Sequence, residues 1–508
     1  MKPRDGFKIV LAADRTLTAD YAILLDAMLA CSQTTAAPLA LIKALMLPKA
    51  RVSGVRAKVA PLGLRRIEAA LAEGGFGADE VAVVEQGRLR EAIGPATRIV
   101  GVATGEPTGR GMNTTTMTAI AGGEGVPAAM FDDLMRAVRR AIRHCRPRPA
   151  VVVGGPGAWQ LAGDRDSAGR LGIDHVVTGY AEGNVADLFR SIARGDDLPD
   201  ATTGEAVGAA HIPRILGASA MGVVEISRGC GLGCPFCTIA RTPMQHLPED
   251  TILADAKTNV ASGNANICAI SEDLFRYGAD GSRTRPEALI SLLSRLRQIG
   301  GVGIIQTDHA NIVSVEQYTG EQLGRVRRLM VGGSGQRHPW VNLGIETASA
   351  ALLKANGCGP KMGPHTGDEW PGFCADQLRR LCRAGFLPMA SIVIGLPGET
   401  ADDTLRTLAW VESLAGERIT IFPELYAPID GGPPVAAGDL SKLHWRLIRA
   451  CYKFNFKWVP RMYWDGQRAA GVGLPRRCLI QALGCGQTLL WKALLARHSR
   501  RSRDVPAD

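Results

Sequence analysis

The most informative stretch of the 508-residue chain is Ser227-Arg228-Gly229-Cys230-Gly231-Leu232-Gly233-Cys234-Pro235-Phe236-Cys237. Its three cysteines stand at C-x3-C-x2-C spacing, directly after an apolar, strand-like run at residues 223–226. Three thiolates at this spacing can hold three irons of one [4Fe–4S] cluster and leave the fourth iron without a cysteine. An iron left open in this way can chelate the amino and carboxylate groups of S-adenosylmethionine (SAM).

The alternative for these cysteines is a structural zinc site or a set of unconnected thiols. Zinc needs a fourth Cys or His at finger-like spacing, and His246 is too isolated in the sequence to supply it. Because the cysteines follow a strand that opens a βα array, the cluster is the favoured interpretation. Phe236 then places an aromatic ring where an adenine would lie.

Downstream of this stretch, strand-like runs alternate with helical ones to about residue 428. Six such runs occur, at residues 223–226, 267–270, 303–306, 341–345, 390–394 and 419–422. Six βα units predict a partial barrel that is open on one side, rather than the closed eight-unit form. From about residue 440 the chain is helical and rich in aromatic residues.

Upstream, the first 200 residues predict an α/β domain with a doubly wound, Rossmann-like parallel sheet. The expected strands are residues 8–13, 81–84, 98–102, 151–153 and 174–178, with helices at residues 62–72 and 130–145. Residues 195–213 are polar and are expected to be the linker. The predicted domains are therefore residues 1–205, residues 215–430 (the partial barrel) and residues 431–508 (helical, with a basic tail).

The composition, with 46% hydrophobic and 21% charged residues, is that of a soluble globular enzyme. The net charge is +10, and part of the excess lies near the end, at Arg497, Arg500, Arg501 and Arg503. A solvated, disordered end is a commoner explanation of such a tail than a nucleic-acid site, so nucleic acid is not an expected partner.

Nothing at residues 1–8 resembles a signal peptide, and the twelve cysteines have no disulfide-like spacing, so a reducing, cytoplasmic location is expected. The most apolar helical stretch, residues 478–496, is interrupted by Gln481, Gln487 and Lys492. These polar side chains favour a buried or partner-facing helix over a membrane span.

From about residue 221 to residue 428 the chain resembles the radical SAM superfamily, whose fold is a (βα)6 partial barrel. The superfamily's second-strand motif, which holds the SAM amino group, is similar to Ser271, Glu272 and Asp273. Its fourth-strand region resembles residues 343–349, which would put Glu346 near the SAM ribose or carboxylate, and its fifth-strand motif resembles residues 394–400, including Gly395. Taken singly, Glu346 could be a structural hydrogen-bond acceptor and the glycine motif a turn, but their order after the cysteines supports SAM binding.

A doubly wound domain before such a barrel resembles the cobalamin-binding class of radical SAM enzymes. The resemblance rests on two turns that follow strands, and it assigns cobalamin contacts to Gly154, Gly155, Pro156, Gly157, Gly179, Tyr180, Glu182 and Gly183. Small residues there would let the backbone approach a bulky ligand. The alternative is any flavodoxin-like domain that closes its turns with glycine.

One loop departs from that class. Many cobalamin domains carry Asp-x-His-x-x-Gly after the first strand, with the histidine on cobalt, whereas this chain reads Asp14-Arg15-Thr16-Leu17-Thr18-Ala19. Thr16 is no substitute for an imidazole ligand, so base-off cobalamin without a protein histidine is expected. The loop that contains Thr104 and Glu106 is the candidate for the lower face of the corrin.

Residues 60–68, 105–111 and 271–278 also resemble an archaeal subgroup that includes the enzyme that C-methylates a glutamine of methyl-coenzyme M reductase. The resemblance implies a cobalamin-dependent radical SAM methyltransferase acting on an unactivated sp3 carbon of a peptide or a small molecule, with an external electron donor. The alternatives are a cobalamin-linked cyclase or oxidative enzyme, a cobalamin-free radical SAM enzyme, and a non-catalytic iron–sulfur or cobalamin sensor. A methylthiotransferase is disfavoured, because its front domain uses three cysteines for a second cluster and only Cys31 and Cys145 precede Cys230.

Overall fold

The front of the protein is built on one parallel sheet. The computed structural model describes residues 5–502, and its first sheet has the strand order β5-β1-β6-β7-β8-β9. The bounds are β1 (Ile9–Ala13), β5 (Val81–Val83), β6 (Ile99–Ala103), β7 (Ala150–Gly154), β8 (His175–Thr178) and β9 (Ala201–Thr203). The predicted doubly wound α/β fold is confirmed. The linker prediction is wrong at residues 201–203, which pair with β8 and extend the sheet.

Helices cover both faces of this sheet because successive residues of each buried strand point to opposite sides. On one face, Ile9 and Leu11 pack with α4 (Leu62–Glu73) and α10 (Val185–Arg194). On the other, Val10 packs with α7 (Val126–Ile142). Short helices complete the layers: α1 (Arg15–Thr18), α5 (Leu89–Ala92), α8 (Trp159–Ala162) and α9 (Arg165–Leu171).

The second half forms an open partial barrel. Two parallel sheets follow one another, β11-β14-β15 and β16-β17-β18-β19, and β15 and β16 are separated by Asp308 alone. The strands are β11 (Val223–Glu225), β14 (Ile267–Ile270), β15 (Ile305–Thr307), β16 (His309–Ala310), β17 (Trp340–Glu346), β18 (Leu387–Ile394) and β19 (Thr420–Leu425). The principal helices between them are α11 (Glu249–Ala261), α12 (Pro286–Gln298), α14 (Gly320–Val331), α16 (Trp370–Arg383) and α17 (Ala401–Ser413). The first and last strands do not pair, so the predicted six-unit, open architecture is confirmed.

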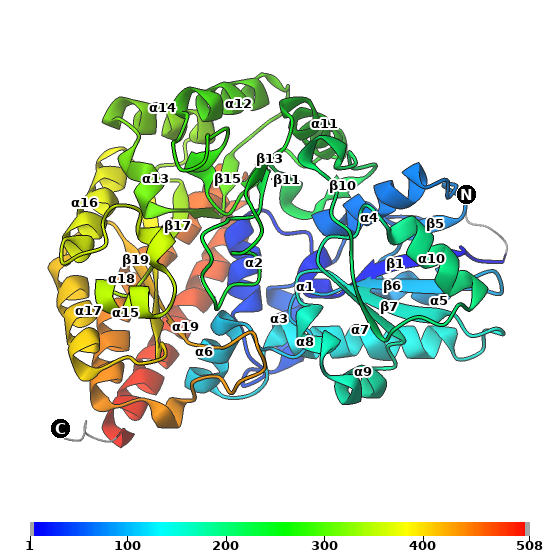
Figure 1. Cartoon of the computed structure of the whole chain (residues 1–508), viewed down its shortest axis with the longest axis horizontal. Coiled ribbons are helices and arrows are strands. Elements are labelled where there is room, and N and C mark those ends of the chain that lie inside the picture. The colour runs from blue at the N-terminus through cyan, green and yellow to red at the C-terminus, as the bar shows by residue number, and fades with distance from the viewer. Residues whose placement is uncertain (1–4, 503–508) are drawn as a thin grey trace.

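Three helices from the front half lie towards the barrel. The first two, α2 (Leu24–Cys31) and α3 (Leu39–Leu45), follow β1 and lie between the front sheet and the barrel (Figure 1). Leu25 packs with Ile304 and Leu387, at the amino-terminal ends of barrel strands. The third, α6 (Met112–Ala121), packs on the edge strand β19. Helices α2 and α6 therefore cover parts of the barrel that its own strands leave open, whereas α3 packs on α7 of the front domain.

The chain ends in two long helices, α18 (Lys442–Ala469) and α19 (Leu474–Arg501), as the helical C-terminal prediction requires. Tyr463 Oη and Gln467 Nε2 of α18 both donate to Asp26 of α2. Arg497, Arg500 and Arg501 end α19 and are not part of a disordered tail, and Arg503 lies outside the described residues.

Helix α19 differs from the expected buried helix. By length and composition it could cross a membrane, and only 6% of its most apolar 18-residue stretch is buried in the protein. Five of its leucines are exposed: Leu474, Leu479, Leu483, Leu489 and Leu490. The expectation of a buried helix is wrong, whereas a partner-facing helix stays a prediction.

Candidate functional site

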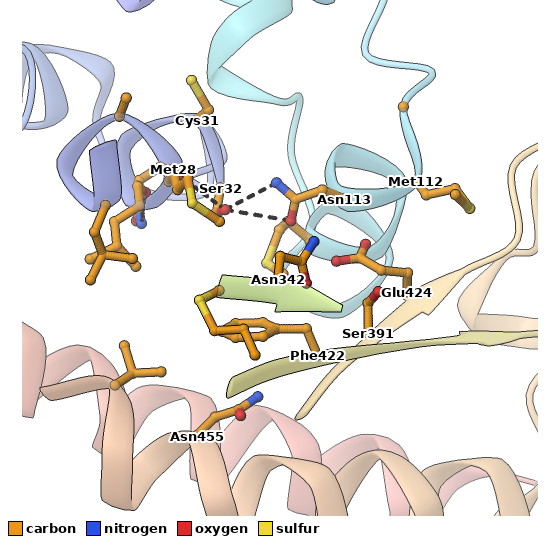
Figure 2. A pocket seen from close by; sticks show the side chains of 18 of the residues that line it. Met28, Cys31, Ser32, Met112, Asn113, Asn342, Ser391, Phe422, Glu424 and Asn455 are labelled. Atoms are coloured by element: carbon orange, nitrogen blue, oxygen red, sulfur yellow. Dashed lines mark hydrogen bonds between the residues drawn. The ribbon is translucent and has the colours of Figure 1, made fainter. Parts of the chain in front are cut away.

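One cavity of about 1300 Å³ lies where the front domain, the barrel and the C-terminal helices meet. Its wall includes all three cysteines of the 227–237 stretch, Glu106 of the front domain, and residues of α2, α6, α18 and α19. Figure 2 shows the part of this wall where α2 and α6 face the barrel strands and α18. The cavity is therefore shared by segments from the whole chain.

The cysteine loop is folded tightly by its glycines. Gly229, Gly231 and Gly233 have φ of +81°, +74° and +76°, in the left-handed region that favours glycine. The Cys230 N–H donates to Thr242 O at 2.9 Å, which ties the loop to the segment that returns from it. All three thiols consequently reach the same cavity.

These thiols suit a cluster better than a single ion. Within residues 5–502, no three His, Cys, Asp or Glu side chains converge on a point that could hold one metal ion. Thiols that each bind a different iron of one cluster stand farther apart than ligands that share an ion. A hydrogen bond from the Cys358 thiol, aided by the charge of Lys361 and opposed by burial, lowers the pKa of Cys234 to about 7. The donor set fits a [4Fe–4S] cluster.

Two of the carboxylates predicted to bind SAM lie in the cavity wall. Glu272 is close enough to Cys230 and Cys237 that its charge raises the pKa of both thiols, after burial. Glu346 has a φ of +66°, strained for a non-glycine residue, and pairs with the buried Lys361. A Cβ at Gly344 would meet the ends of both side chains, so a larger residue there would displace this pair.

The other residues predicted to bind SAM have different surroundings. Asp273 turns away from the cavity and accepts a hydrogen bond from Ser314 Oγ at 2.6 Å. Ser271 Oγ accepts from the Asp273 N–H, and Gly395 N–H donates to Glu399 Oε2. Phe236 lines the cavity. Ser271, Asp273 and Gly395 do not, and all of them remain predicted SAM-binding residues.

In the front domain, Asp14 and Thr16 bond to each other. Thr16 donates to the Asp14 carboxylate from its N–H at 2.8 Å and from its hydroxyl at 2.5 Å. Burial raises the pKa of Asp14 to about 6, against these hydrogen bonds. The side chain at the position of the expected histidine is thus engaged within its own loop.

The glycine turn after β7 packs against the protein itself. A Cβ at Gly155 would lie 2.9 Å from Thr104 O, and one at Gly157 would collide with Gly105 O. At Gly154, by contrast, the nearest atom would be Val177 O at 3.5 Å, an ordinary contact. Pro156 lies between the two tight positions. Close packing of two loops is therefore enough to explain the glycines at 155 and 157, and a role in ligand binding stays a prediction.

Two buried polar atoms lie unpaired near the carboxyl end of β6. Thr104 Oγ1 and Glu106 Oε2 have no hydrogen-bond partner within the described residues. Burying such groups without a partner is costly, so a polar ligand at this edge would be favoured. This observation makes the edge compatible with a corrin, whose periphery carries amide groups.

The turn after β8 is bound to the barrel. Arg228, two residues before Cys230, donates to Glu182 Oε1 at 2.8 Å and to Glu225 Oε1 at 2.8 Å, and it lies 3.8 Å above the Tyr180 ring. Gly179 is open around its Cβ position, whereas a Cβ at Gly183 would lie 2.9 Å from Glu205 O. Tyr180 and Glu182 thus connect the two domains beside the cysteine loop.

Sequence reasoning did not identify several residues of the cavity wall. They are Lys361, Asn342, Ser391 and Glu424 of the barrel, and Ser32 and Asn113, which bond to each other across α2 and α6 (Figure 2). Asn342 in β17 and Glu424 in β19 each lie between two buried apolar residues, and this alternation in the sequence could have identified them as facing a cavity. Ser32 and Asn113 carry no such signal.

Comparisons with known proteins agree on the architecture. The chain matches no protein-family model. It is 26% identical over 210 residues to the ribosomal protein uS12 methylthiotransferase RimO of Leptospira biflexa, covering 41% of this chain and 42% of that protein. The corresponding protein of Trichlorobacter lovleyi is 24% identical over 284 residues, which are 56% of this chain and 58% of that protein. The chain thus spans about half the length of the curated relatives it matches.

Among solved structures, the chain superimposes on the radical SAM methyltransferase TsrM from Kitasatospora setae, determined with tryptophan and a SAM analogue. The TM-score is 0.54 and the sequence identity 15%, over 83% of this chain and 75% of TsrM. Another TsrM structure, with cobalamin and a [4Fe–4S] cluster bound, gives a TM-score of 0.50. The protein therefore shares the overall fold of TsrM, with a front sheet, a partial barrel and a helical C-terminal region.

Proposed function

We propose that the protein is a cobalamin-dependent radical SAM methyltransferase that methylates an unactivated sp3 carbon. The observation that carries the proposal is the shared cavity, because Cys230, Cys234, Cys237, Glu346 and the front-domain Glu106 all line it. The fold shared with TsrM and the similarity to RimO support the same class. We keep residues 1–205, 215–430 and 431–508 as the predicted domains.

In this proposal the three thiolates hold the cluster, and Glu272, Glu346 and Lys361 orient SAM beside it. The front-domain loop with Thr104 and Glu106 holds cobalamin. When bound, the cluster supplies an electron for SAM cleavage and cobalamin supplies a transferable methyl group. Apolar side chains such as Phe236 and Trp491 exclude water from the reacting groups, and burial of the cysteine loop does the same. An external electron donor and a cytoplasmic location complete the proposal.

The similarity to methylthiotransferases makes transfer of a methylthio group the competing function. Cys31 lines the cavity from α2, whereas Cys145 lies after α7 and contacts Gly94 O at 3.9 Å. These two front-domain cysteines therefore offer no three-thiol set for a second cluster, which supports methyl transfer.

The deciding experiment is anaerobic reconstitution with iron, sulfide, cobalamin and SAM that carries a labelled methyl group. The proposal expects cobalamin uptake, formation of 5′-deoxyadenosine and a product that gains one labelled methyl. A glutamine-containing peptide of methyl-coenzyme M reductase, the predicted archaeal-type substrate, is one arm, and small-molecule pools are the other. Protein that takes up no cobalamin, or a product that gains sulfur, would contradict the proposal.

A further inference from the structure

Three neighbouring barrel strands present polar side chains to the cavity. Asn342 on β17, Ser391 on β18 and Glu424 on β19 line it, and Figure 2 shows them together on one part of the wall. The register brings them close, since Ser391 pairs with Phe422, two residues before Glu424. Within residues 5–502, the side chains of Asn342 and Ser391 make no hydrogen bond to the protein. This trio is free to bind a ligand.

Glu424 is poorly satisfied by the protein. Thr116 Oγ1 lies 3.3 Å from its carboxylate but only 2.7 Å from Met112 O. A hydroxyl has one proton, and the shorter contact takes it. Glu424 forms no ion pair within the described part of the chain. Its carboxyl group therefore lacks both a strong donor and a counter-charge.

The charges that face Glu424 are negative. Burial raises the pKa of Glu424 to about 8, against the Thr116 contact, and the charges of Glu106 and Glu346 raise it further. Tyr452 of α18 is the other titratable group that interacts with it. Without a ligand, most Glu424 side chains are consequently uncharged at neutral pH.

The cations of the cavity are already engaged elsewhere. Lys361 pairs with Glu346, and Arg110 lies over the Trp159 ring at 5.6 Å. The other basic residues of the wall are Arg476, whose charge acts on Asp26, and His309, which pairs with Asp308 at 3.4 Å. The region around Glu424 therefore has a deficit of positive charge that a ligand could supply.

The wall beside the trio is apolar. Met28, Met389, Phe422 and Phe456 line it, and methionine and aromatic side chains adapt to apolar groups of varied shape. A ligand that fits both parts of the wall carries a cationic group on an apolar body.

We propose that Asn342, Ser391 and Glu424 bind the protonated nitrogen of a small amine substrate whose apolar body lies on the adjoining wall. This inference rests on the proposed function, because it takes the ligand of the cavity to be the substrate of that reaction. The Asn342 carbonyl and the Ser391 hydroxyl accept two N–H groups, and the Glu424 carboxylate accepts the third. Since Glu424 starts out protonated, its O–H proton leaves to solvent as the ammonium ion binds, and the substrate keeps its own three protons.

Calorimetric titration of the anaerobically purified full-length protein with 2-phenylethylamine tests the site. Repeating it in buffers of different ionisation enthalpy near pH 7 counts protons, and we expect release of about 0.9 proton for a carboxyl with the raised pKa of about 8. Glu424→Gln should weaken binding roughly ten- to a hundredfold, because a neutral amide then replaces the carboxylate that accepts from the ammonium ion. Glu412→Gln, which removes an exposed carboxylate from α17 of the same barrel, is the matched control and should bind as wild type.

The neutral probes 2-phenylethanol and 3-phenylpropionamide test the alternative that the site binds an uncharged ligand. A glutamine side chain still donates a hydrogen bond, as the protonated carboxyl does, so a site for a neutral acceptor would keep its affinity in Glu424→Gln. Tight binding of the alcohol or amide, unchanged amine binding by Glu424→Gln, or no amine binding by the wild type would each overturn the proposal. Thermal midpoints and iron–sulfur absorption establish that the variants are folded.

The two proposals fail separately. If the amine binds with proton release but the reconstituted enzyme takes up no cobalamin, the amine site stands and the methyltransferase proposal falls. If labelled methyl transfer occurs only to a neutral substrate, the methyltransferase stands and the amine site falls.

Discussion

At the residue scale, the thiols of the cysteine loop are expected to bind the cluster, whereas buried thiols elsewhere in the chain serve only to pack the core. Replacing Cys234 with Ala should abolish the iron–sulfur absorption and SAM cleavage, and the Cys234→Ala/Cys358→Ala variant removes the neighbouring thiol as a substitute ligand. Cys374, buried in α16, packs as a small apolar group, so Cys374→Ala should keep the cluster. A fully assembled cluster in the double variant would refute the assignment.

Glu346 is the second residue with a separable role. Glu346→Ala should leave the cluster assembled but lower the affinity for SAM roughly ten- to a hundredfold, because a hydrogen bond to a charged ligand is lost. Equilibrium binding of SAM to the reconstituted wild type and variant measures this difference in affinity. Unchanged affinity in a folded variant would mean that Glu346 serves only to hold Lys361.

Glu424 also predicts a pH dependence of stability. Its folded pKa of about 8 exceeds the ordinary 4.5, so the folded state binds more protons than the unfolded state between these values. Stability from this group is therefore fully present below about pH 4.5 and is lost as the pH rises towards 8. Relative to Glu424→Gln, the wild type should lose about 2 kcal/mol of unfolding free energy between pH 5 and pH 8.5, with allowance for screening at a side chain that is not fully buried. Parallel pH profiles of urea unfolding for the two proteins would contradict this expectation.

At the scale of elements, the junction between the turn after β8 and the cysteine loop depends on one buried guanidinium. Arg228 pairs with both Glu182 and Glu225, and all three side chains are nearly inaccessible. Arg228→Met leaves the buried Glu182 without its cation and leaves Glu225 with Arg66 alone, at 4.0 Å, and should cost about 3–5 kcal/mol of unfolding free energy. Arg194→Met, which breaks a fully exposed pair, should leave the unfolding free energy nearly unchanged. Equal losses in the two variants, measured by urea unfolding, would show that the buried pair is not a structural junction.

The strands can be predicted from the sequence more readily than the helices that join the two domains. Most strands of the front sheet and of the barrel are short apolar runs because both of their faces are buried, and the sequence predicts such runs to within three residues. The short strands β9 and β16 carry no such run and are not predicted. Helices α2, α3 and α6 were not assigned, because short amphipathic segments do not indicate which distant element they cover. Lys361 lies fifteen residues after Glu346 in a one-turn 3-10 helix, and no sequence pattern connects the two. The pairing of Glu182 with Arg228 likewise depends on how the two domains meet.

At the scale of the whole molecule, the front-domain proposal predicts how cobalt is ligated. Thr16 occupies the histidine position and bonds to Asp14, so no imidazole from this loop can reach a cobalt ion. Electron paramagnetic resonance of the protein with cob(II)alamin should show no nitrogen hyperfine splitting from an axial ligand. Splitting from one nitrogen would leave the cofactor assignment intact but refute this account of the loop.

Gly154 offers the matching steric test. Unlike Gly155 and Gly157, it has room for a Cβ against the protein, so Gly154→Val should fold and yet exclude a ligand that lies along the turn. Loss of cobalamin uptake with the iron–sulfur cluster retained is the expected outcome. Undiminished uptake would remove this turn from the binding site.

The bond between α2 and α18 has a consequence for the order of events during synthesis. Asp26 is synthesised long before its partners Tyr463 and Gln467, which follow it by 437 and 441 residues. The front sheet can pair its strands long before then, whereas the Asp26 carboxylate accepts only from the nearby Ala22 and Ile23 N–H groups until α18 has been made. Contacts this distant in sequence form late and slowly. The cavity wall is thus completed as one of the last steps of folding, and nascent or truncated chains that end before α18 would have a folded front sheet but no enclosed site for oxygen-sensitive groups.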